Sequence, residues 1–539
     1  MQNGSDGDLV QTWLVSHALL GTSTIDNRTS SRVAAVPTLP MAAGVGLFVL
    51  LWLLHLNYTS LVPPVDDLEQ LTWVRSLEWG YYKHPPLPTW LLWLPVQAFG
   101  WSAWTVYVVG ASTTVTSLLL MWRLVARLRG ERHALVALLA AACVTYYNGR
   151  LNYFNHNIVL MLLNACSAAV TWQCFRSGRL RWWIALGLCL GLGALAKYQI
   201  VVTYVCVIAF AVHSRFWRDG AQRRGLLLAS LIGLVIFSPH VQWLRAHDFG
   251  PVFYAMSTSL GVGHPLLART AESVHWLADQ MLNRALPALL LLLWVAWPLR
   301  GRSAVPSEPT AGAERPPSAR ALLLIFGFVP LGFMTLLGLT SGADLQLHWG
   351  TPFLLFVIPA LMELARGVSW ARAALPRLLA GFVVINALLL TVSHVTSPLG
   401  PRALRDTHWR TFDPKPVARA LEAIRGTLGG PIRILSGPPA VAAAVALELP
   451  EHPLVLIDGR RDESPWVSKA MERAGGVVEI GATGELPGGH LLGSALPGWS
   501  YRALPSSRSP KSRPPYRIDH ATGFARATQV RRSPPESCC

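Results

Sequence analysis

The sequence predicts a polytopic α-helical membrane protein with a small α/β domain toward its C-terminal end. Of the 539 residues, 52% are hydrophobic and only 14% are charged, whereas a soluble chain would carry about a quarter charged residues. Apolar runs of about 20 residues recur along the chain, and each is long enough to cross a bilayer as a helix. The 22 Trp residues fit the aromatic belts that form at membrane interfaces.

We expect about 11 spans, within a range of about 10–13, with boundaries accurate to about four residues. They are predicted at residues 41–57, 103–122, 133–148, 157–174, 182–197, 199–214, 225–241, 283–299, 320–339, 350–366 and 377–395. Segment 86–100, PLPTWLLWLPVQAFG, is too short and too rich in proline to span comfortably. We therefore expect it to lie at the interface or to re-enter the membrane from one side.

The loops between the predicted spans form two sets that differ in positive charge. One set carries 18 Arg and lies at 123–132, 175–182, 213–224, 300–320 and 366–377. The other set carries five Lys or Arg and lies at 58–85, 149–156, 242–282 and 340–349. Because cytoplasmic loops are enriched in Lys and Arg, the first set is expected inside and the second outside the inner or plasma membrane. The net charge of +17 thus indicates topology and not a nucleic-acid-binding surface.

This topology divides the chain into four parts. They are a cytoplasmic tail at 1–40, a transmembrane domain at 41–397, an extracytoplasmic α/β domain at 398–489 and a disordered basic tail at 490–539. The α/β domain is predicted from an amphipathic helix at 414–425, buried strands at 431–436 and 454–458, and an Ala-rich helix at 440–449. Residues 303–319 are expected to be a flexible inner linker. The 7 Cys show neither a disulfide framework nor metal-ligand spacing.

Polar and ionisable side chains that are unusual in a membrane domain collect in the segments expected outside. The adjacent carboxylates Asp66 and Asp67 lie in the loop 58–85, which we interpret as an active-site loop. The other candidates are Tyr82 and His84 in the same loop, Arg150 and Asn155 in GRLNYFNHN, Lys197 and Tyr198 at a span end, His240 in SPHVQW, and Gln346, His348 and Trp349 in DLQLHWG. Such groups at the span ends of a helical bundle indicate a functional site.

Several of these residues also fit structural roles. Asp66 and Asp67 could cap a helix after Pro63-Pro64, because Asp is a preferred N-cap residue. Lys197 could extend to lipid head groups. Asn155 and Asn157 could be loop caps.

The outer histidines leave the question of a metal open. His84, His240 and His348 fit hydrogen-bonded interface residues, and they could also meet a carboxylate at a divalent cation. Their spacing does not require a metal, so the sequence assigns no metal ligand and no certain cofactor.

The chemistry that fits these residues is group transfer at the outer membrane face. A carboxylate can act as general base on an acceptor hydroxyl that is held in line with an electrophilic carbon. Cations such as Arg150 and Lys197 can bind a phosphate leaving group and balance its growing charge. No nucleotide-binding motif is visible and nucleotides are scarce outside the cell, which favours an activated lipid-linked donor.

The segment GYYKHPPL at 80–87, with Trp73, Leu77 and the Asp66-Asp67 pair, carries a family resemblance. It resembles the first outer loop of the polyprenyl-phosphate-dependent glycosyltransferases of the GT-C superfamily. The likeness is to the dolichyl-phosphate-mannose-protein mannosyltransferase-like branch, glycosyltransferase family 39, which includes relatives of the aminoarabinose transferases. That branch shows Asp-Glu-Ala-Tyr-Tyr-x-x-Trp, then Leu, then Gly-Tyr-Tyr-x-His-Pro-Pro-Leu. Residues 68–70 depart from its Ala-Tyr-Tyr.

Later segments continue the resemblance in the same order. They are RLNYFNHNIVLMLLN, GLGALAKYQ, SPHVQWLRAHDFGPVFYAM, HWGTPFLLFVIPAL and HPLVLIDGRRDESPWVS. The likeness therefore extends over residues 41–480, and the tail after 490 resembles nothing known to us.

The resemblance implies a GT-C fold and an enzyme that moves a sugar from a polyprenyl-phosphate donor to a hydroxyl of a glycolipid, cell-envelope glycan or protein. It implies inversion at the anomeric carbon, with Asp66 as the base or the residue that positions the acceptor. Asp67 replaces a Glu and reaches one methylene less far. The implied donor contacts are Tyr82, His84, Arg150, Asn155, Lys197 and Tyr198, and the implied substrate contacts are His240, Gln346, His348 and Trp349. Some relatives bind a divalent cation and others need none.

Two other functions stay open at this point. A transporter or flippase would place ionisable groups near the midplane on broken helices of two related halves, whereas these carboxylates lie in a loop and no repeat is visible. A family member without activity that acts as an assembly scaffold is the other alternative, because residues 68–70 depart from the motif. The expected partners are the lipid-linked donor, the acceptor and membrane lipids.

Overall fold

The structure is a computed structural model that describes residues 38–505 except 261–262, 264, 300–316, 366, 406–410 and 429, and also 510, 517–518 and 525–526. The chain divides into two units, Met1–Gly44 and Val45–Cys539, and the site described below lies in the second. Nearly all of the predicted tail 1–40 and of the predicted linker 303–319 lies outside the described residues.

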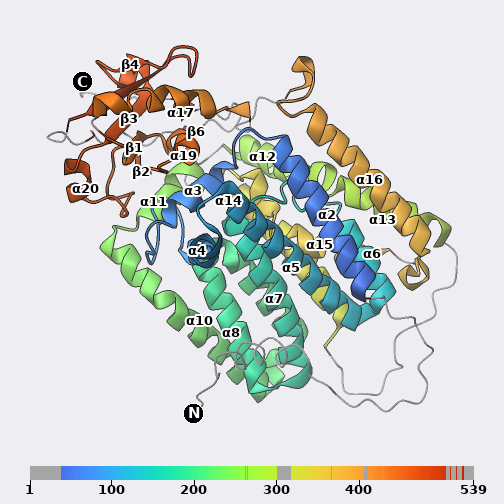
Figure 1. Cartoon of the computed structure of the whole chain (residues 1–539). Helices are drawn as coiled ribbons and strands as arrows, with labels where there is room; N and C mark the ends of the chain where they lie inside the picture. Colours follow the sequence, from blue (N-terminus) through green and yellow to red (C-terminus); the bar gives the residue numbers. More distant parts are fainter. Residues whose placement is uncertain are drawn as a thin grey trace, which may run out of the picture. The chain divides into compact units, whose positions relative to one another are not determined.

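Six helices of the described residues are long and apolar enough to cross a membrane. They are α2 (Thr38–Tyr58), α5 (Ala103–Arg129), α7 (His156–Ser177), α10 (Gly220–Ala246), α14 (Ala319–Ser341) and α16 (Leu375–Val395), all labelled in Figure 1. A seventh candidate is the pair Leu266–Arg284 and Leu286–Leu299, which bends by 54° at its break. The pair comprises α12 (Leu266–Ala278), the π-helix η4 (Asp279–Arg284), α13 (Leu286–Ala296) and the 3-10 helix η5 (Trp297–Leu299).

The remaining predicted spans fall on shorter helices. These are α6 (Glu131–Ala141), α8 (Leu180–Ala196), α9 (Val201–His213) and α15 (Leu354–Leu364). The protein is therefore a multi-pass helical membrane protein, as predicted, while the count of eleven spans stays a prediction. Segment 86–100 forms α4 (Leu87–Phe99), a helix of 13 residues that contains Pro95, which is shorter than a membrane span requires.

α8 lies alongside α10 (Figure 1), and glycines of α8 face α10. A Cβ at Gly187 would lie 2.7 Å from the carbonyl oxygen of Ala229, and a Cβ at Gly191 would lie 3.1 Å from the Cα of Gly233. Small residues one helical turn apart let two backbones approach closely within a membrane. This close contact fixes the end of α8, directly before Lys197.

The turns between α6 and α7, at residues 142–155, lie against α5. A Cβ at Gly110 of α5 would lie only 2.4 Å from the carbonyl oxygen of Tyr153. No larger residue fits at Gly110 without displacing that backbone. The glycine therefore sets the position of Phe154 and Asn155, which contact the two carboxylates described below.

The C-terminal part forms a five-stranded mixed sheet of order β2-β1-β3-β5-β4. Its strands are β1 (Ile434–Gly437), β2 (Leu454–Ile457), β3 (Val477–Ala482), β4 (His490–Leu491) and β5 (Trp499–Leu504). Its helices are α17 (Lys415–Glu422), α18 (Arg425–Leu428), α19 (Pro439–Glu448) and α20 (Lys469–Arg473). The predicted strands at 431–436 and 454–458 and the Ala-rich helix correspond to β1, β2 and α19.

The sheet extends beyond the predicted domain boundary at residue 489. β5 pairs antiparallel with β3 over its whole length, and β4 pairs with β5. The disordered tail predicted from 490 is therefore wrong for residues 490–504. Ser, Pro and Arg are frequent after residue 490, but strand pairing with β3 is a tertiary contact that local composition does not reveal.

The loop that carries the two carboxylates shares a hydrophobic core with the C-terminal domain. It forms a short helix, α3 (Val65–Trp73), which packs on α19. Leu68 and Trp73 of α3 are buried together with Tyr81 and with apolar residues of the sheet domain. The Trp73 and Tyr81 rings stack with centroids 5.1 Å apart. The carboxylate helix is thus held from both the membrane helices and the C-terminal domain.

We predict that Gly110→Ala lowers both stability and activity. The added methyl group must displace the Tyr153 carbonyl, and overpacking of this kind costs about 1–3 kcal/mol. Melting of the purified variant in detergent measures the loss. Gly46→Ala is the matched control, because a Cβ there meets nothing within 4 Å. An unchanged melting temperature of Gly110→Ala would contradict the close approach of α5 to this turn.

Candidate active site

The helix α3 begins directly after Pro63-Pro64 and carries both carboxylates in its first turn. Pro64 is the N-cap residue and makes no side-chain capping bond, so neither Asp66 nor Asp67 caps the helix. The capping alternative is therefore wrong. Negative charge in the first turn is favoured by the helix dipole, which helps two adjacent carboxylates to be tolerated there.

The two carboxylates face different surroundings because they are adjacent on a helix. Successive residues of a helix point about 100° apart, whereas residues three and four positions apart share a face. Asp66, Glu69 and Gln70 line one polar cavity, and Asp67 does not. The helical period thus separates the directions of the two carboxylates, and the packing of α3 places Asp66 at the cavity.

The polar cavity has a volume of about 60 Å³ and is lined by segments far apart in sequence. Its lining residues are Asp66, Glu69, Gln70, His84, Asn155, His156, Asn157, Lys197, His348 and Trp349. Half of the predicted site residues meet here, namely Asp66, His84, Asn155, Lys197, His348 and Trp349. The other half lie outside the lining of this cavity.

Asn155 holds Asp66 in place. Its Nδ2 donates to Oδ2 of Asp66 at 2.8 Å. Its Oδ1 accepts from the backbone N–H groups of Asn157, at 3.0 Å, and Ile158, at 3.1 Å. Asn155 is therefore the N-cap of α7 and the partner of the carboxylate at the same time, while Asp66 remains half-exposed.

Lys197 brings a positive charge to the cavity. It follows the last residue of α8, and its Nζ donates to Oδ1 of Asn157 at 2.6 Å. The ammonium also lies 5.5 Å from the ring centroid of Trp349. The side chain turns inward to these partners, which does not fit the alternative of a lysine extended to head groups.

His84 and His156 form a close pair in the cavity. Their ring centroids lie 4.0 Å apart, and Nε2 of His156 lies 3.3 Å from the carbonyl oxygen of Pro85. Burial, and then the nearby His156, Lys197 and Lys83, hold the pKa of His84 well below its usual value. His84 is thus neutral when no anion is bound.

Asp67 is fully buried and holds the turn that follows α6. Its Oδ1 accepts from the backbone N–H of Phe154 at 2.8 Å. Its Oδ2 is buried without a hydrogen-bond partner among the described residues. Burial raises the pKa of Asp67 well above its usual value, although the Phe154 N–H acts in the opposite direction. We therefore interpret Asp67 as a neutral residue that positions Phe154 and its neighbour Asn155.

Glu69 is paired with a lysine from the loop after α3. Lys83 Nζ donates to Glu69 Oε1. Burial alone would lower the pKa of Lys83, but Glu69, Tyr254 and Tyr82 raise it well above its usual value. The Lys83 ammonium lies 5.2 Å from the Tyr82 ring and 5.4 Å from the Tyr254 ring. This ion pair balances the charge of Glu69 and leaves Asp66 as the unpaired acid of the cavity.

Tyr198 and His240 do not line the cavity but contact each other next to the loop that carries the carboxylates. The hydroxyl of Tyr198 lies 2.8 Å from Nε2 of His240, and Nδ1 of His240 lies 2.5 Å from the carbonyl oxygen of Trp79. These two side chains therefore hold the carboxylate loop near Trp79. Gln346 also lies outside the cavity lining, and its Nε2 donates to Asp344 at 2.9 Å.

Arg150 lies in the turn that also contains Asn155, but it does not line the cavity. Its guanidinium carbon lies 5.5 Å from the Tyr146 centroid and 5.3 Å from the Tyr153 centroid. The structure thus separates Arg150 from Lys197, with which the sequence groups it.

Among the described residues, no group of three or more His, Cys, Asp or Glu side chains is arranged to hold a metal ion. His240 is engaged with Tyr198 and does not join His84 and His348 in the cavity. We therefore assign no metal ligand among these residues.

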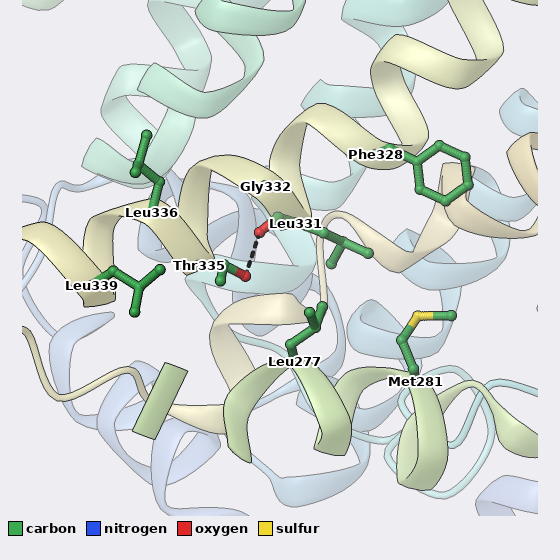
Figure 2. Close-up of a pocket in the computed structure, with 8 residues that line it drawn as sticks. All are labelled: Leu277, Met281, Phe328, Leu331, Gly332, Thr335, Leu336 and Leu339. Carbon is green, nitrogen blue, oxygen red and sulfur yellow. Dashed lines mark hydrogen bonds between the residues drawn. The ribbon is translucent and has the colours of Figure 1, made fainter. Parts of the chain in front are cut away.

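A second, apolar groove of about 460 Å³ lies between α12, η4 and α14 (Figure 2). It is lined by Leu277, Met281, Phe328, Leu331, Gly332, Thr335, Leu336 and Leu339. The hydroxyl of Thr335 donates to the carbonyl oxygen of Leu331 at 2.9 Å, so its polar group is satisfied within the helix. Gln199, which donates to Met334 and to the carbonyl oxygen of Trp349, connects α14 to the cavity wall.

Four residues of the cavity were not among the predicted site residues. They are Glu69, Gln70, His156 and Asn157. Helical periodicity could have found the first two, because they lie three and four positions after Asp66 on a segment that follows two prolines. His156 and Asn157 are adjacent to Asn155, and no local signal shows that all three face one cavity.

Residues 83–243 match the dolichyl-phosphate-mannose-protein mannosyltransferase family. The chain is also 25% identical over 407 residues to the lipopolysaccharide core galacturonosyltransferase RgtB of Rhizobium johnstonii, covering 73% of this chain and 78% of that protein. It is 23% identical over 366 residues to RgtA of the same organism, covering 62% of this chain and 69% of that protein. The matched family segment includes His84, Asn155 and Lys197.

The fold is similar to that of ArnT from Cupriavidus metallidurans. The structure of ArnT bound to undecaprenyl phosphate matches with a TM-score of 0.54 and 15% identity, over 84% of this chain and 94% of that chain. The apo structure of the same protein matches with a TM-score of 0.52.

The chain is a membrane glycosyltransferase of the GT-C type. Within that class it is similar to the dolichyl-phosphate-mannose-protein mannosyltransferase family and to the ArnT and Rgt proteins, in agreement with the resemblance of the first-loop motif. The transporter alternative is set aside by this identification.

We predict that Asp67→Asn keeps the melting temperature and at least about a third of the activity, because the amide oxygen can still accept from Phe154. Asp67→Ala leaves that buried N–H unpaired, which costs about 1–3 kcal/mol and lowers activity with it. Thermal melting and turnover of the two variants measure this. Loss of activity in a fully folded Asp67→Asn variant would instead indicate that the charge of Asp67 takes part in the reaction.

Proposed function

We propose that this protein transfers a sugar from a polyprenyl-phosphate-linked donor to an acceptor hydroxyl at the extracytoplasmic membrane face, with inversion. The observation that carries this proposal is Asp66, a half-exposed carboxylate that Asn155 holds at the wall of a polar cavity. A base in this position needs a fixed orientation and an open side for the substrate, and Asp66 has both.

In the proposed reaction Asp66 accepts the proton of the acceptor hydroxyl. The acceptor oxygen forms a bond to the anomeric carbon while the bond from that carbon to the phosphate oxygen breaks. The electron pair leaves with the polyprenyl phosphate. A single displacement of this kind inverts the anomeric carbon, and holding the two substrates in line supplies much of the rate enhancement.

Lys197 and the histidine pair are the proposed contacts of the leaving phosphate. The ammonium of Lys197 can balance the growing negative charge in this small cavity. His84 is neutral in the empty site, and a bound phosphate would raise its pKa and favour protonation. His84 or His156 could then donate a hydrogen bond to the departing oxygen.

The apolar groove along α14 is the proposed binding site for part of the polyprenyl chain (Figure 2). A groove lined by Leu, Met and Phe offers only dispersion contacts, which suits an isoprenoid. Support also comes from the similar ArnT structure, in which undecaprenyl phosphate is the bound molecule.

The relatives favour an acidic sugar and an envelope glycolipid. Two of them are named lipopolysaccharide core galacturonosyltransferases. A polyprenyl-phosphate-linked hexuronic acid is therefore the first donor to test, and a lipopolysaccharide core is the first acceptor to test. The extracytoplasmic placement of the site is supported by the charge difference between the two sets of loops. An inner or plasma membrane location is part of the same proposal.

We predict that purified protein with its matching donor and acceptor releases free polyprenyl phosphate, and that Asp66→Asn releases at least about 100-fold less. A panel of polyprenyl-phosphate sugars, including the hexuronic acid, identifies the donor. Asp248→Asn is the matched control, because it removes an exposed carboxylate outside the cavity. The anomeric configuration of the product, read by nuclear magnetic resonance, tests inversion.

Three results would count against parts of this proposal. No release from any donor, with an acceptor-rich membrane extract added, would overturn the donor class and favour a scaffold without activity. Release that is unchanged in folded Asp66→Asn would overturn the role of Asp66 as the base. Retention of the anomeric configuration would overturn the single displacement.

A further inference from the structure

The Lys and Arg side chains expected on the outer face differ in the partners that their charged groups contact. Lys83 is paired with Glu69, Arg75 donates to the carbonyl oxygen of His452 at 3.3 Å, and Arg269 donates to the carbonyl oxygen of Thr340 at 3.1 Å. Arg245 is exposed near the end of α10. Arg150 is half-buried, and its N–H groups make no hydrogen bond or ion pair with the described part of the chain.

Arg150 shares a tyrosine ring with a second arginine. The guanidinium carbons of Arg150 and Arg284 lie 5.5 Å and 5.0 Å from the centroid of Tyr146, which is fully buried. Arg284 Nε donates to Oδ2 of Asp279 at 3.0 Å, so one carboxylate balances this arginine. Arg150 thus adds a positive charge next to an arginine that already has its carboxylate partner.

Stacking on aromatic rings leaves the edge of a guanidinium free. The planar fork of Arg fits a phosphate or carboxylate with two parallel hydrogen bonds. Arg150 rests on two tyrosine rings and keeps its donors available. This arrangement is suited to an anionic ligand and not to a neutral one.

Arg150 and Arg284 lie near a segment that forms the cavity wall, but neither side chain lines the cavity. The hydroxyl of Tyr146 donates to the carbonyl oxygen of Leu347 at 2.6 Å, directly before His348 and Trp349 of the cavity. Arg150 lies five residues before Asn155, the partner of Asp66. A ligand bound at Arg150 would thus be held close to the turn that orients Asp66.

We propose that Arg150, with Arg284 across Tyr146, binds an anionic group of the acceptor, a phosphate or a carboxylate near the hydroxyl that receives the sugar. This inference rests on the proposed glycosyl transfer. The phosphate of the donor already has Lys197 and the histidine pair inside the cavity, which Arg150 does not line. The positive charge at Arg150 therefore serves the second substrate.

Direct binding tests this site without turnover. The probes are bisphosphorylated lipid A, the same lipid A after removal of its phosphates, a phosphate-free lipid A that carries acidic inner-core sugars, and undecaprenyl phosphate. Affinities are measured by thermophoresis on the full-length protein in nanodiscs. We expect wild type to bind at least one anionic glycolipid about tenfold more tightly than the neutral one, which corresponds to about 1.4 kcal/mol.

The variants separate the acceptor from the donor. Arg150→Ala should lose the tenfold preference and keep the affinity for undecaprenyl phosphate, and Arg150→Lys should keep part of the preference because it retains the charge. Arg245→Ala, an exposed arginine of the same face, should bind as wild type. Melting temperatures establish that each variant is folded, and Arg150→Lys serves as the conservative replacement if Arg150→Ala does not fold.

Two results would overturn the inference. One is a wild-type protein that does not distinguish anionic from neutral glycolipids. The other is an Arg150 variant that loses affinity for undecaprenyl phosphate, which would assign the arginine to the donor. Neither result depends on sugar transfer, so failure of the proposed function would show separately, in the release of polyprenyl phosphate.

Discussion

The site depends on one asparagine that makes two kinds of contact. Oδ1 of Asn155 caps α7, and Nδ2 of the same side chain holds Asp66. One residue further back, the Phe154 N–H donates to Asp67. The carboxylate helix α3 and the turn before α7 are therefore joined by two adjacent hydrogen bonds. Since an N-cap has a fixed geometry relative to its helix, Asp66 is fixed relative to a membrane helix.

The charged side chains of the site differ in whether a partner of opposite charge neutralises them. Asp66 and Lys197 meet at the cavity, while Glu69 reaches the same cavity but is neutralised by Lys83 from the adjacent loop. Asp67 is buried away from the cavity, and burial raises its pKa well above the usual value. Electrostatic interactions are strong where water is excluded, so these pairings decide which charge faces a substrate. Among the described residues, Asp66 and Lys197 are thus an acid and a cation of the cavity that form no ion pair.

The C-terminal domain is part of the machinery that positions the site. Leu68 and Trp73 of α3 are buried in the same hydrophobic core as the strands and helix of the sheet domain. The guanidinium of Arg75 lies 4.4 Å from the Trp101 ring and donates to the His452 carbonyl. Part of α3 is thus covered by residues more than 300 positions later in the chain. A short helix of 9 residues would not be stable without such packing.

The sequence by itself determined the membrane class, the carboxylate loop, and most of the helix and strand positions of the C-terminal domain, because apolar length and periodicity are local properties. It also supplied the family, through the motif around GYYKHPPL. Tertiary structure decided the rest. It turned Asp66 toward the cavity and Asp67 away from it, placed His240 behind the loop, separated Arg150 from Lys197, and extended the sheet to residue 504. Each of these depends on which distant backbone packs against the segment, and a local pattern carries no information about that.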